Sequence, residues 1–370
     1  MSKEMSGRIV LFGATGYTGE MTARALLGRG ASPVLAARSA ERLERLADEL
    51  GGLETHVADV SRPETVRALV EGRDVLVSTV GPFLRWGTPA AEAAIDAGAV
   101  YIDSCGEPAF IRRVFEDYGP RAERTGASLL TAFGYDWVPG NLAGALALSE
   151  AGETATRVQI GYFGQGEAGS SGGTQASLIG AMLEPSFAFK GGRLRTERIG
   201  ARVRKFDLGR SRDSLAISVG GSEHLTLPAL HPQLEEVDVL LGRPGAYVRL
   251  MPALSAVIAG ATRLAPARAA LRSVLGRRAK GSTGGPDEAA RSRTSSTVIA
   301  TAYAAGGRKL NTVKLAGVNS YTFGFDMLAW AASTAATGDV GSPGALGPVA
   351  AFGLEDLEAG VRAAGIQRVQ

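Results

Sequence analysis

The chain has 370 residues, 45% of them apolar and 21% charged, with a formal net charge of +3. This composition is typical of a globular protein with room for two domains, and the small charge, spread as alternating signs, argues against nucleic acid as a partner. A single cysteine, Cys105, excludes an internal disulfide. No apolar run reaches the ~18 residues of a membrane span, and "MSKEMSGR" lacks the apolar core of a signal peptide, so we expect a cytoplasmic protein.

The first predicted unit is a strand, a glycine-rich turn and a helix. Ile9–Phe12 is an apolar run typical of a buried strand, and Glu20–Leu27 favours a helix. We predict that the turn between them binds a dinucleotide: Gly13 permits the turn, Gly16 admits a pyrophosphate and Gly19 lets the helix pack closely. The helix start would then attract the anion. The predicted contacts are Gly13, Thr15, Gly16, Tyr17, Thr18 and Gly19. The alternative is a glycine-rich turn that binds nothing, since the spacing is G-x-x-G-x-x-G and not G-x-G-x-x-G.

The second predicted strand, Pro33–Ala37, is followed by Arg38 and Ser39. NAD-binding chains usually carry an acid here to hold the ribose 2′-hydroxyl, whereas a guanidinium and a hydroxyl suit a 2′-phosphate. Arg42 lies one helical turn further and could assist. The sequence therefore predicts NADP, the alternative being that Arg38 is a solvated surface charge.

Strand and helix patterns alternate through the first 145 residues. Helices are predicted at Glu41–Leu50 and Pro63–Val70, and further strands at Thr55–Val60, Asp74–Phe83, Val100–Pro108 and Ser128–Gly140. This alternation predicts an α/β fold with a Rossmann-type, doubly wound parallel sheet over residues 1–145. Ligands of such sheets lie beyond the carboxyl ends of the strands. The predicted coenzyme contacts at these ends are Asp59, Val80, Gly81, Pro82, Phe83, Cys105, Gly106 and Glu107.

The chain shows no complete catalytic constellation. It lacks a Y-x-x-x-K pair, its three histidines are scattered, and no metal site is predicted. The nicotinamide would therefore carry the reaction while the protein positions it. Tyr135 and Asp136 are the first candidates for proton donor or substrate anchor, followed by Glu107 and Cys105. Three of them also have a purely structural interpretation: Asp136 as the cap of a helix, Tyr135 as part of the core, and Cys105 as a small buried side chain. A water molecule would then supply the proton.

The second half predicts an α+β domain over residues 146–319. Short alternating segments from about Val158 indicate a mixed or antiparallel sheet with one solvated face. Thr297–Asn319 reads as a hairpin turning at Gly306-Gly307, and the helices of residues 320–370 are expected to pack back on the first domain. Ser170–Thr174 precedes a helix, either as an ordinary cap or as a source of N–H groups for a ligand.

Met251–Arg278 combines helical apolar spacing with five arginines. Such a helix can lie on an anionic membrane surface or on an acidic partner such as an acyl carrier protein. We favour a solvated helix packed on the protein's own sheet. The loop after it, up to Ser296, is long enough to be disordered or to form a lid over the substrate.

Four motifs, "GATGYTG", "STVGPF", "YIDSCGE" and "GYDWVPGNLAG", resemble the saccharopine dehydrogenase-like reductases, in particular the bacterial trans-acting enoyl reductases of polyketide lipid synthesis. The similarity continues in "SGGTQAS", "GVNSYTFGFDMLAWAAS" and "SPGALGPVAAFG". In the sixth-strand motif, Trp137, Gly140 and Asn141 replace two serines and an acid of the family pattern G-[FY]-D-S-[IVL]-P-S-D.

The resemblance implies NADPH-dependent hydride transfer to a C=C or C=N bond of a small-molecule or acyl-carrier-bound substrate. Two other hypotheses stay open. The chain could be an NADP-binding regulatory or scaffold protein without turnover, or a membrane- or lipid-associated protein acting through the basic helix. The sequence also leaves open whether the chain forms a homodimer.

Overall fold

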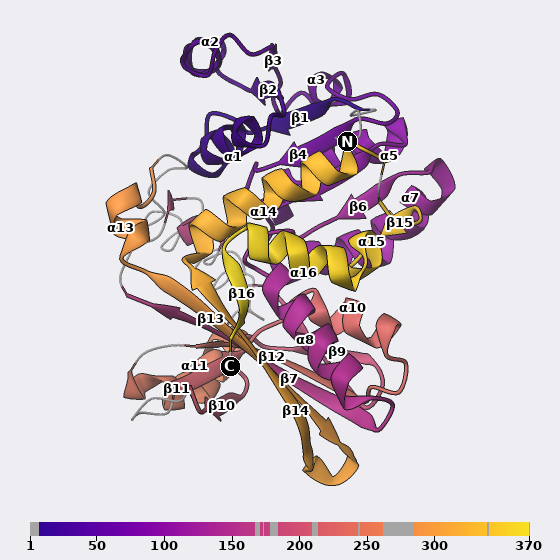
Figure 1. Ribbon diagram of the computed structural model, residues 1–370, viewed down its shortest axis with the longest axis vertical. Coiled ribbons are helices and arrows are strands. Elements are labelled where there is room, and N and C mark those ends of the chain that lie inside the picture. Colours follow the sequence, from indigo (N-terminus) through magenta and orange to yellow (C-terminus); the bar gives the residue numbers. More distant parts are fainter. Residues whose placement is uncertain are drawn as a thin grey trace.

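Two sheets organise the chain. The computed structural model describes residues 7–166, 171–172, 174–177, 184–208, 214–242, 245–261, 284–338 and 340–369. The first sheet is parallel, with seven strands in the order β15-β6-β5-β4-β1-β2-β3 (Figure 1). Its strands are β1 (Ile9–Phe12), β2 (Val34–Ala37), β3 (Thr55–Val57), β4 (Val75–Ser78), β5 (Val100–Asp103), β6 (Ser128–Leu130) and β15 (Gly344–Ala345). This order confirms the predicted doubly wound sheet.

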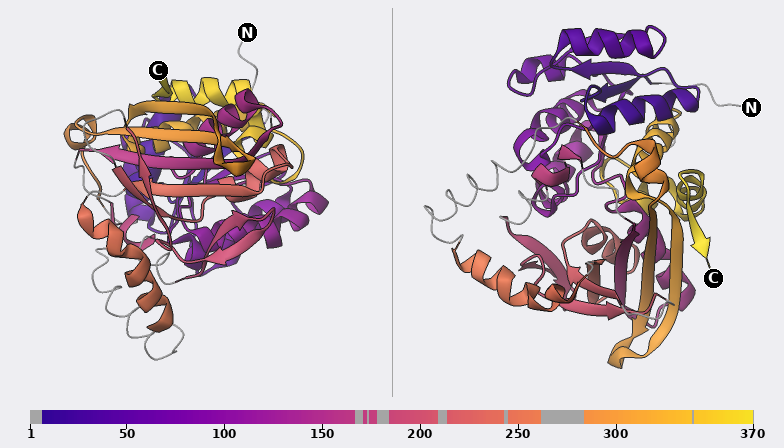
Figure 2. Two further views of the ribbon diagram at one scale, coloured as in Figure 1. Left: turned by 90° about the horizontal axis from the view of Figure 1, so that it is seen from below. Right: turned by 90° about the vertical axis from the view of Figure 1, so that its left-hand side faces the viewer.

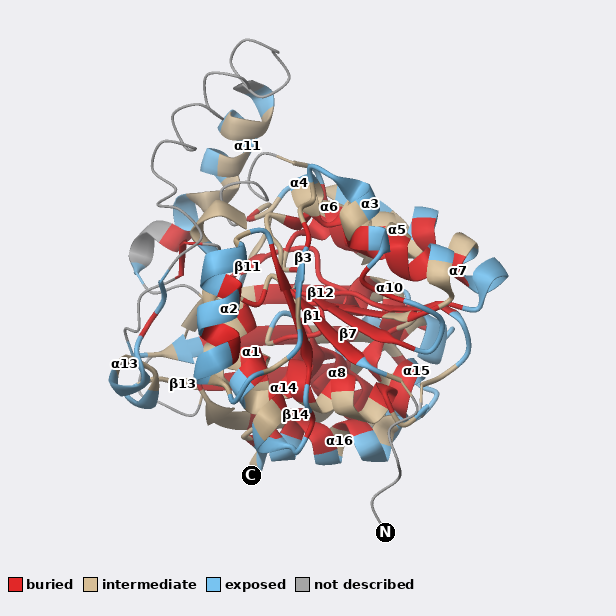
Figure 3. Cartoon of the chain, turned by 90° about the horizontal axis from the view of Figure 1, so that it is seen from above, coloured by how far each residue is buried: buried red, intermediate tan, exposed pale blue. Residues whose placement is uncertain are grey.

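Apolar strands explain why this sheet is buried. Every residue of β1, β2 and β4 is buried, as expected for parallel strands covered on both faces. The covering helices are α1 (Tyr17–Gly28), α2 (Ala40–Glu49), α3 (Pro63–Arg67), α4 (Phe83–Trp86), α5 (Thr88–Ala97), α6 (Pro108–Arg113), a π-helical turn (Val114–Tyr118) and α7 (Gly119–Thr125). Buried residues line the strands, and exposed ones lie on the surface helices and loops (Figure 3).

Several predicted strands end earlier in the structure. The runs predicted at Asp74–Phe83, Val100–Pro108 and Ser128–Gly140 become short strands followed by loops at the carboxyl edge of the sheet. These loops hold the predicted site residues. The seventh strand, β15, comes from the far end of the chain and is only two residues long, so it carries no sequence pattern of its own.

The second sheet is mixed, as predicted. Its main path is β10-β11-β12-β7-β13-β14-β16, with β8 paired to β12 and β9. The strands are β7 (Ala155–Gln165), β8 (Ser186–Lys190), β9 (Leu194–Glu197), β10 (Val203–Phe206), β11 (Ser214–Ser218), β12 (Glu236–Gly242), β13 (Ser295–Ala304), β14 (Lys309–Val318) and β16 (Ile366–Val369). β12 and β7 run parallel, and the other pairs are antiparallel. β13 and β14 form the predicted hairpin, with Ala305–Gly307 at its turn.

Helices connect the two sheets (Figure 2). The buried helix α8 (Val138–Ala151) follows the sixth-strand loop and packs on β7, β13 and β14. α14 (Ser320–Ala335) packs on α1, β4 and β5 of the first sheet, whereas α16 (Leu354–Ala363) packs on α8 and β16. The chain thus returns to both sheets, and the division into residues 1–145 and 146–319 stays a prediction. The remaining helices in the described part of the chain are α10 (Glu223–Leu230), a 3₁₀ turn (Ala246–Leu250), α11 (Met251–Ala261), α13 (Glu288–Ser292) and α15 (Pro348–Phe352).

Candidate functional site at the edge of the parallel sheet

The glycine turn between β1 and α1 has the geometry of a phosphate cradle. Gly13 has φ +91°, and a Cβ there would lie 2.6 Å from Thr79 Oγ1 and 2.9 Å from Val80. A Cβ at Gly19 would lie 2.2 Å from the Gly13 carbonyl oxygen, so α1 can pack on the turn only through glycine. Gly16 differs, because a Cβ there would meet only that carbonyl oxygen, at 3.3 Å, among the described residues. The space above Gly16 is therefore open.

The start of α1 faces this open space. Gly16 is the N-cap residue, so no side chain closes the first N–H groups of the helix. These groups and the positive end of the helix dipole favour an anion. The predicted residues Thr15, Tyr17 and Thr18 are half-buried around the same turn. The residues present thus fit the pyrophosphate of a dinucleotide.

The second strand end carries the predicted 2′-phosphate contacts. Arg38 is exposed directly after β2, and Ser39 is the N-cap residue of α2 but makes no capping hydrogen bond. Arg42 donates from Nη2 to the Thr15 carbonyl oxygen at 2.8 Å, which ties α2 to the glycine turn. Hydrogen bonds from Ser61 hold the pKa of Asp59 below its usual value, and the charges of Arg62 and Arg38 add to this. Asp59 therefore carries a negative charge near Arg38.

The loops after β4 and β5 are joined through Glu107. Its buried carboxylate accepts hydrogen bonds from the backbone N–H groups of Phe83 (2.7 Å) and Leu84 (3.1 Å), and from Ser177 Oγ (2.8 Å). Glu107 thus closes the start of α4 and carries the Val80–Phe83 loop. Val80, Gly81 and Pro82 are half-buried at the edge, with Gly81 in a cis bond to Pro82, whereas Phe83 is buried. This placement makes Glu107 a support of the loop.

Cys105 lies inside the protein. Burial raises the pKa of its thiol well above the usual value, with nearby Asp103 and Glu107 adding to this, so the reactive thiolate is disfavoured. Asp103, which the sequence analysis did not single out, is buried and accepts hydrogen bonds from Thr131, Ala132 and the Cys105 N–H. Burial raises the pKa of Asp103 to about 6. Asp103 joins the ends of β5 and β6.

The two predicted catalytic residues are neighbours in sequence but occupy different environments. Asp136 is exposed, and a Cβ at Gly106 would lie 3.2 Å from Asp136 Oδ2, so the two loops meet. The Tyr135 hydroxyl is buried without a hydrogen bond among the described residues, although Ser296 is near enough to affect its pKa, which burial raises. The Tyr135 ring packs edge-on against Tyr162 and Phe323.

Behind this loop lies a buried polar junction, formed by Trp137, Asn141, Tyr162, Ser222, Glu223 and Thr226. Tyr162 Oη lies 2.6 Å from Glu223 Oε1 and 3.1 Å from the Trp137 carbonyl oxygen. Asn141 donates to the same carbonyl (3.0 Å) and to Ser222 Oγ (2.9 Å), and it accepts from Thr226. Burial raises the pKa of Glu223 to about 8, so this carboxyl is neutral at pH 7.

The junction accounts for the departures from the family pattern. A Cβ at Gly140 would lie 1.9 Å from Tyr162 Oη and 2.4 Å from Glu223 Oε1, so a larger residue does not fit. Trp137 and Asn141 belong to the same junction. Neither Tyr162 nor Glu223 was predicted from the sequence. The only signal was the departure itself, because both partners lie far along the chain.

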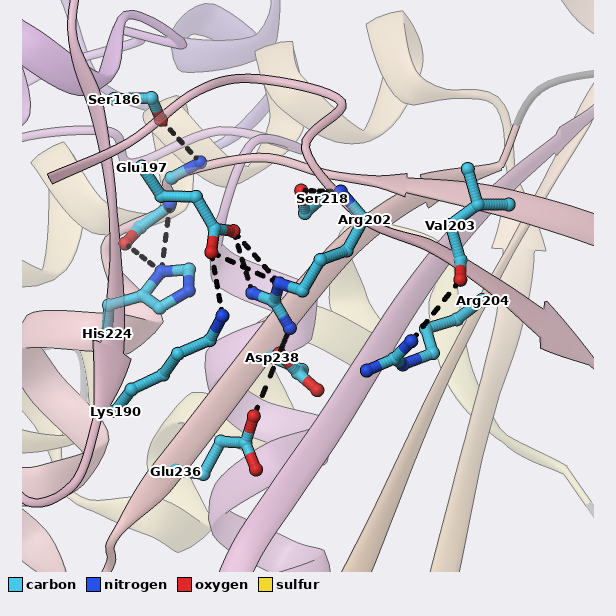
Figure 4. Close-up of polar contacts among 12 residues, drawn as sticks. Ser186, Lys190, Glu197, Arg202, Val203, Arg204, Ser218, His224, Glu236 and Asp238 are labelled. Carbon is cyan, nitrogen blue, oxygen red and sulfur yellow. Dashed lines mark hydrogen bonds and ion pairs between the residues drawn. The ribbon is translucent and has the colours of Figure 1, made fainter. Parts of the chain in front are cut away.

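A second polar cluster spans β8, β9 and β12 (Figure 4). Arg202 pairs with Glu197 at 2.9 Å and with the buried Asp238, and Lys190 pairs with Glu197 at 2.7 Å. Burial opposes ionisation of Glu197, but the two cations outweigh it and lower its pKa. Because both cations have carboxylate partners within the protein, Arg202 with Glu236 as well, we interpret this cluster as structural.

The second half of the chain contains two segments that the sequence singled out, Ser170–Thr174 and the basic helix Met251–Arg278. Ser171 Oγ accepts the Thr174 N–H at 3.2 Å, which is the geometry of an ordinary cap, while Ser170 lies outside the described residues. α11 exposes Leu254 and Val257, and residues 262–278 of the predicted basic helix also lie outside. Among the described residues no helix has the length and apolarity to cross a membrane, and no group of acids, histidines or cysteine could hold a metal.

Two pockets among the described residues lie away from the predicted site. One of about 260 Å³ is lined by Gln165, Leu208, Thr297 and Lys314 among others, on the second sheet. Another of about 140 Å³ lies beside α16 and β16. The predicted coenzyme and catalytic residues instead meet along the carboxyl edge of the parallel sheet, as the contacts above show.

Comparison with known proteins agrees with the geometry of the first sheet. Residues 9–130 match the saccharopine dehydrogenase NADP binding domain family. A Mycobacterium tuberculosis protein provisionally named trans-acting enoyl reductase is 39% identical over 183 residues, which are 46% of this chain and 43% of that protein. The trans-acting enoyl reductase of Mycobacterium ulcerans is 38% identical over 147 residues, covering 38% and 35% of the two chains. This chain therefore aligns with less than half the length of these relatives.

A solved structure extends the likeness of fold. Saccharopine dehydrogenase (L-Glu forming) from Saccharomyces cerevisiae superposes with a TM-score of 0.60 at 12% identity, covering 98% of this chain and 100% of that one. At this identity the comparison shows a shared fold. The resemblance predicted from the sequence is thus confirmed: residues 9–130 of this chain match the saccharopine dehydrogenase NADP-binding domain, and the fold is that of a saccharopine dehydrogenase.

Proposed function

We propose that the chain is an NADPH-dependent reductase acting on an electron-poor C=C bond of an enoyl substrate, either free or carrier-bound. The observation that carries this proposal is the meeting of Asp136 and Gly106 at the sheet edge that also holds the glycine turn. The names of the mycobacterial relatives favour an enoyl substrate. Reduction of a C=N bond is the alternative chemistry that the same arrangement supports.

NADPH, when bound, supplies a hydride from its nicotinamide ring. The β carbon of an enoyl thioester accepts this hydride, and the electron pair of the C=C bond moves toward the thioester carbonyl. The α carbon then needs a proton to give the saturated product. The protein must therefore hold the substrate over the Val80–Phe83 and Cys105–Glu107 loops and provide or admit that proton.

Asp136 is better placed for the proton than Tyr135. Its carboxyl is exposed at the edge, whereas the Tyr135 hydroxyl is buried and burial raises its pKa. We assign to Asp136 the transfer of the proton, directly or through a water, and to Tyr135 a packing role against Tyr162 and Phe323.

The test is turnover of Asp136→Asn against a matched control. Asp117 is an exposed carboxylate on the π-helical turn Val114–Tyr118, away from the strand ends, so Asp117→Asn is the control. With a 2-enoyl thioester or a cyclic imine as substrate, loss of nicotinamide absorbance reports the rate. We expect Asp136→Asn to lower kcat by about 100-fold or more while the Kd for NADPH changes less than about twofold.

Two results would count against this proposal. A wild-type rate in Asp136→Asn removes Asp136 from the proton transfer. Tight NADPH binding without turnover of either substrate class would instead favour the binding protein without catalysis. Deuterium at the β carbon after reaction with 4-deuterated NADPH would establish direct hydride transfer.

A further inference from the structure

A segment of the second half of the chain lies against the glycine turn. Tyr17, the first residue of α1, donates its hydroxyl to the Pro286 carbonyl oxygen at 2.5 Å. Arg291 of α13 donates from Nη1 to Tyr17 Oη at 3.0 Å and to the Pro286 carbonyl oxygen at 2.9 Å. A Cβ at Gly285 would lie 2.5 Å from the Tyr17 ring, so this segment approaches the ring closely. Tyr17, Pro286 and Arg291 form one junction, which we call the Tyr17 clasp.

The clasp is held from two sides. The Tyr17 ring packs edge-on against Tyr321 and Phe325 of α14, at 5.6 and 5.5 Å between ring centroids. The Arg291 guanidinium lies 5.9 Å from the Phe325 ring centroid, and the Arg291 carbonyl oxygen accepts a hydrogen bond from Asn319 Nδ2 at 3.1 Å. Because Asn319 also caps α14, the backbone of Arg291 is fixed relative to both α1 and α14. The guanidinium is therefore held against the side chain of Tyr17, the residue that follows Gly16 of the cradle.

The Arg291 guanidinium makes no ion pair among the described residues, although burial and then the nearby charge of Asp287 raise the pKa of Tyr17 in the same clasp. The hydrogen bonds of the Arg291 guanidinium go to two neutral oxygens, and among the described residues its Nε and Nη2 have no hydrogen-bond partner. The side chain contacts the hydroxyl of Tyr17, the first residue of α1, and the start of α1 carries roughly half a positive charge. On another side of the turn, Arg42 donates to the Thr15 carbonyl oxygen. An anion bound at the helix start would be attracted by both arginines and by the helix dipole.

We propose that Arg291 is a ligand of the coenzyme's diphosphate bridge, so that the second half of the chain supplies part of the dinucleotide site. Tyr17 is then a positioning residue, whose hydroxyl orients the guanidinium. A planar guanidinium suits this task because it can bind two phosphate oxygens at once. Arg38 would bind the 2′-phosphate and Arg291 the diphosphate. This assignment concerns coenzyme binding and does not depend on the proposed enoyl substrate.

The test compares two ligands that differ in the diphosphate. NADPH carries both the bridge and the 2′-phosphate, whereas 2′-AMP carries only the latter. NADPH fluorescence gives its Kd, and competition gives that of 2′-AMP. We expect Arg291→Ala to weaken NADPH by roughly 10- to 100-fold and to leave 2′-AMP within about twofold, because a charged hydrogen bond is lost. Arg291→Lys should lie between Ala and wild type.

Arg293→Ala is the matched control, since Arg293 is an exposed arginine of the same segment outside the clasp. A second readout is hydrogen exchange of peptides covering residues 285–294, which NADPH should slow in the wild type and not in Arg291→Ala. NADPH affinity within twofold of wild type in Arg291→Ala would overturn the proposal. So would an equal loss for 2′-AMP, which would indicate that Arg291 only supports the fold. Failure of enoyl turnover would leave these binding results unaffected.

Discussion

Glycines create space at two places in the molecule, the β1–α1 turn and the buried junction behind the sixth-strand loop, and the two spaces serve different purposes. At the β1–α1 turn, Gly16 leaves space that no described side chain fills. At the junction behind the loop, Gly140 and Gly221 leave space that Tyr162 and Glu223 fill, with a would-be Cβ at Gly221 2.3 Å from Glu223 Oε2. Gly16, the first set, makes room for a molecule from outside the chain. Gly140 and Gly221, the second set, make room for buried polar side chains of the chain itself. Substitutions in the first set should therefore change coenzyme affinity, and substitutions in the second set should change the free energy of unfolding.

The largest effect is expected from Gly140→Ala. A methyl group there would overlap Tyr162 Oη and Glu223 Oε1 and would break a buried hydrogen bond. We expect the free energy of unfolding to fall by about 3 kcal/mol. Denaturant unfolding measures this, and the NADPH affinity of the folded protein should stay near wild type. A loss of coenzyme affinity without a loss of stability would contradict the separation of the two sets.

Gly16→Val should weaken coenzyme binding and leave the stability of the fold nearly unchanged. Gly16 has an extended backbone with φ −86°, which any residue can adopt, so the fold should tolerate the side chain. The valine would occupy the approach of the pyrophosphate and should weaken NADPH by roughly 50-fold, or about 2.3 kcal/mol. Fluorescence titration and thermal unfolding on one preparation give both numbers. An unchanged Kd would show that the space above Gly16 is not used.

The buried junction should also leave a signature in the dependence of stability on pH. Because the pKa of Glu223 is raised to about 8 in the folded state, the folded protein binds a proton there that the unfolded chain has lost above its ordinary pKa. The free energy of unfolding should therefore fall as pH rises from the ordinary pKa of a glutamate, 4.5, to the raised pKa of about 8, and it should level off above that. Asp103, with a pKa of about 6, acts with the same sign mainly at lower pH, and its contribution is the same in a Glu223 variant, so the difference between the two proteins over pH 6 to 8 reports Glu223.

Glu223→Gln keeps a neutral side chain and should flatten this slope. We expect the wild type to lose about 2 kcal/mol between pH 6 and 8 and the variant much less. The buried His224 contributes on the acid side, because burial lowers its pKa to about 4, so its contribution is lost as pH falls from about 6.5. Equal slopes in wild type and variant over pH 6 to 8 would mean that Glu223 is ionised throughout.

The smallest effect concerns coenzyme choice. Arg38 is exposed after β2, so Arg38→Ala should hardly change stability. We expect NADPH to bind about tenfold more weakly and NADH to be unaffected, because only NADPH carries the 2′-phosphate. The quantity to measure is the ratio of the Kd for NADPH to the Kd for NADH, in the wild type and in the variant. If both coenzymes weaken together, Arg38 supports the loop and does not recognise the phosphate.

The sequence predicts features that are local in the chain. The β1–turn–α1 unit lies within 20 residues, and its apolar strand, three glycines and helix are sufficient to predict it. The strand alternation likewise predicts the parallel sheet. The family match confirms NADP as the coenzyme of this domain, while the individual contacts, Arg38 included, stay predictions.

Features that depend on distant partners could not be predicted. Tyr17 and Arg291 are 274 positions apart, and Tyr162 and Glu223 are 61 apart, so no spacing rule joins them. Glu107 was predicted from its place after β5, but only the structure shows that its carboxylate receives the Phe83 and Leu84 N–H groups. The pattern places a side chain at an edge, and the packing decides which way it faces.

The central claim is that NADP occupies the carboxyl edge of the parallel sheet, over Gly16. A crystal structure of the chain with NADPH tests it most directly. We predict the diphosphate at the start of α1 and the 2′-phosphate within hydrogen-bond distance of Arg38. Phosphates bound elsewhere, or an empty turn at saturating coenzyme, would contradict the account.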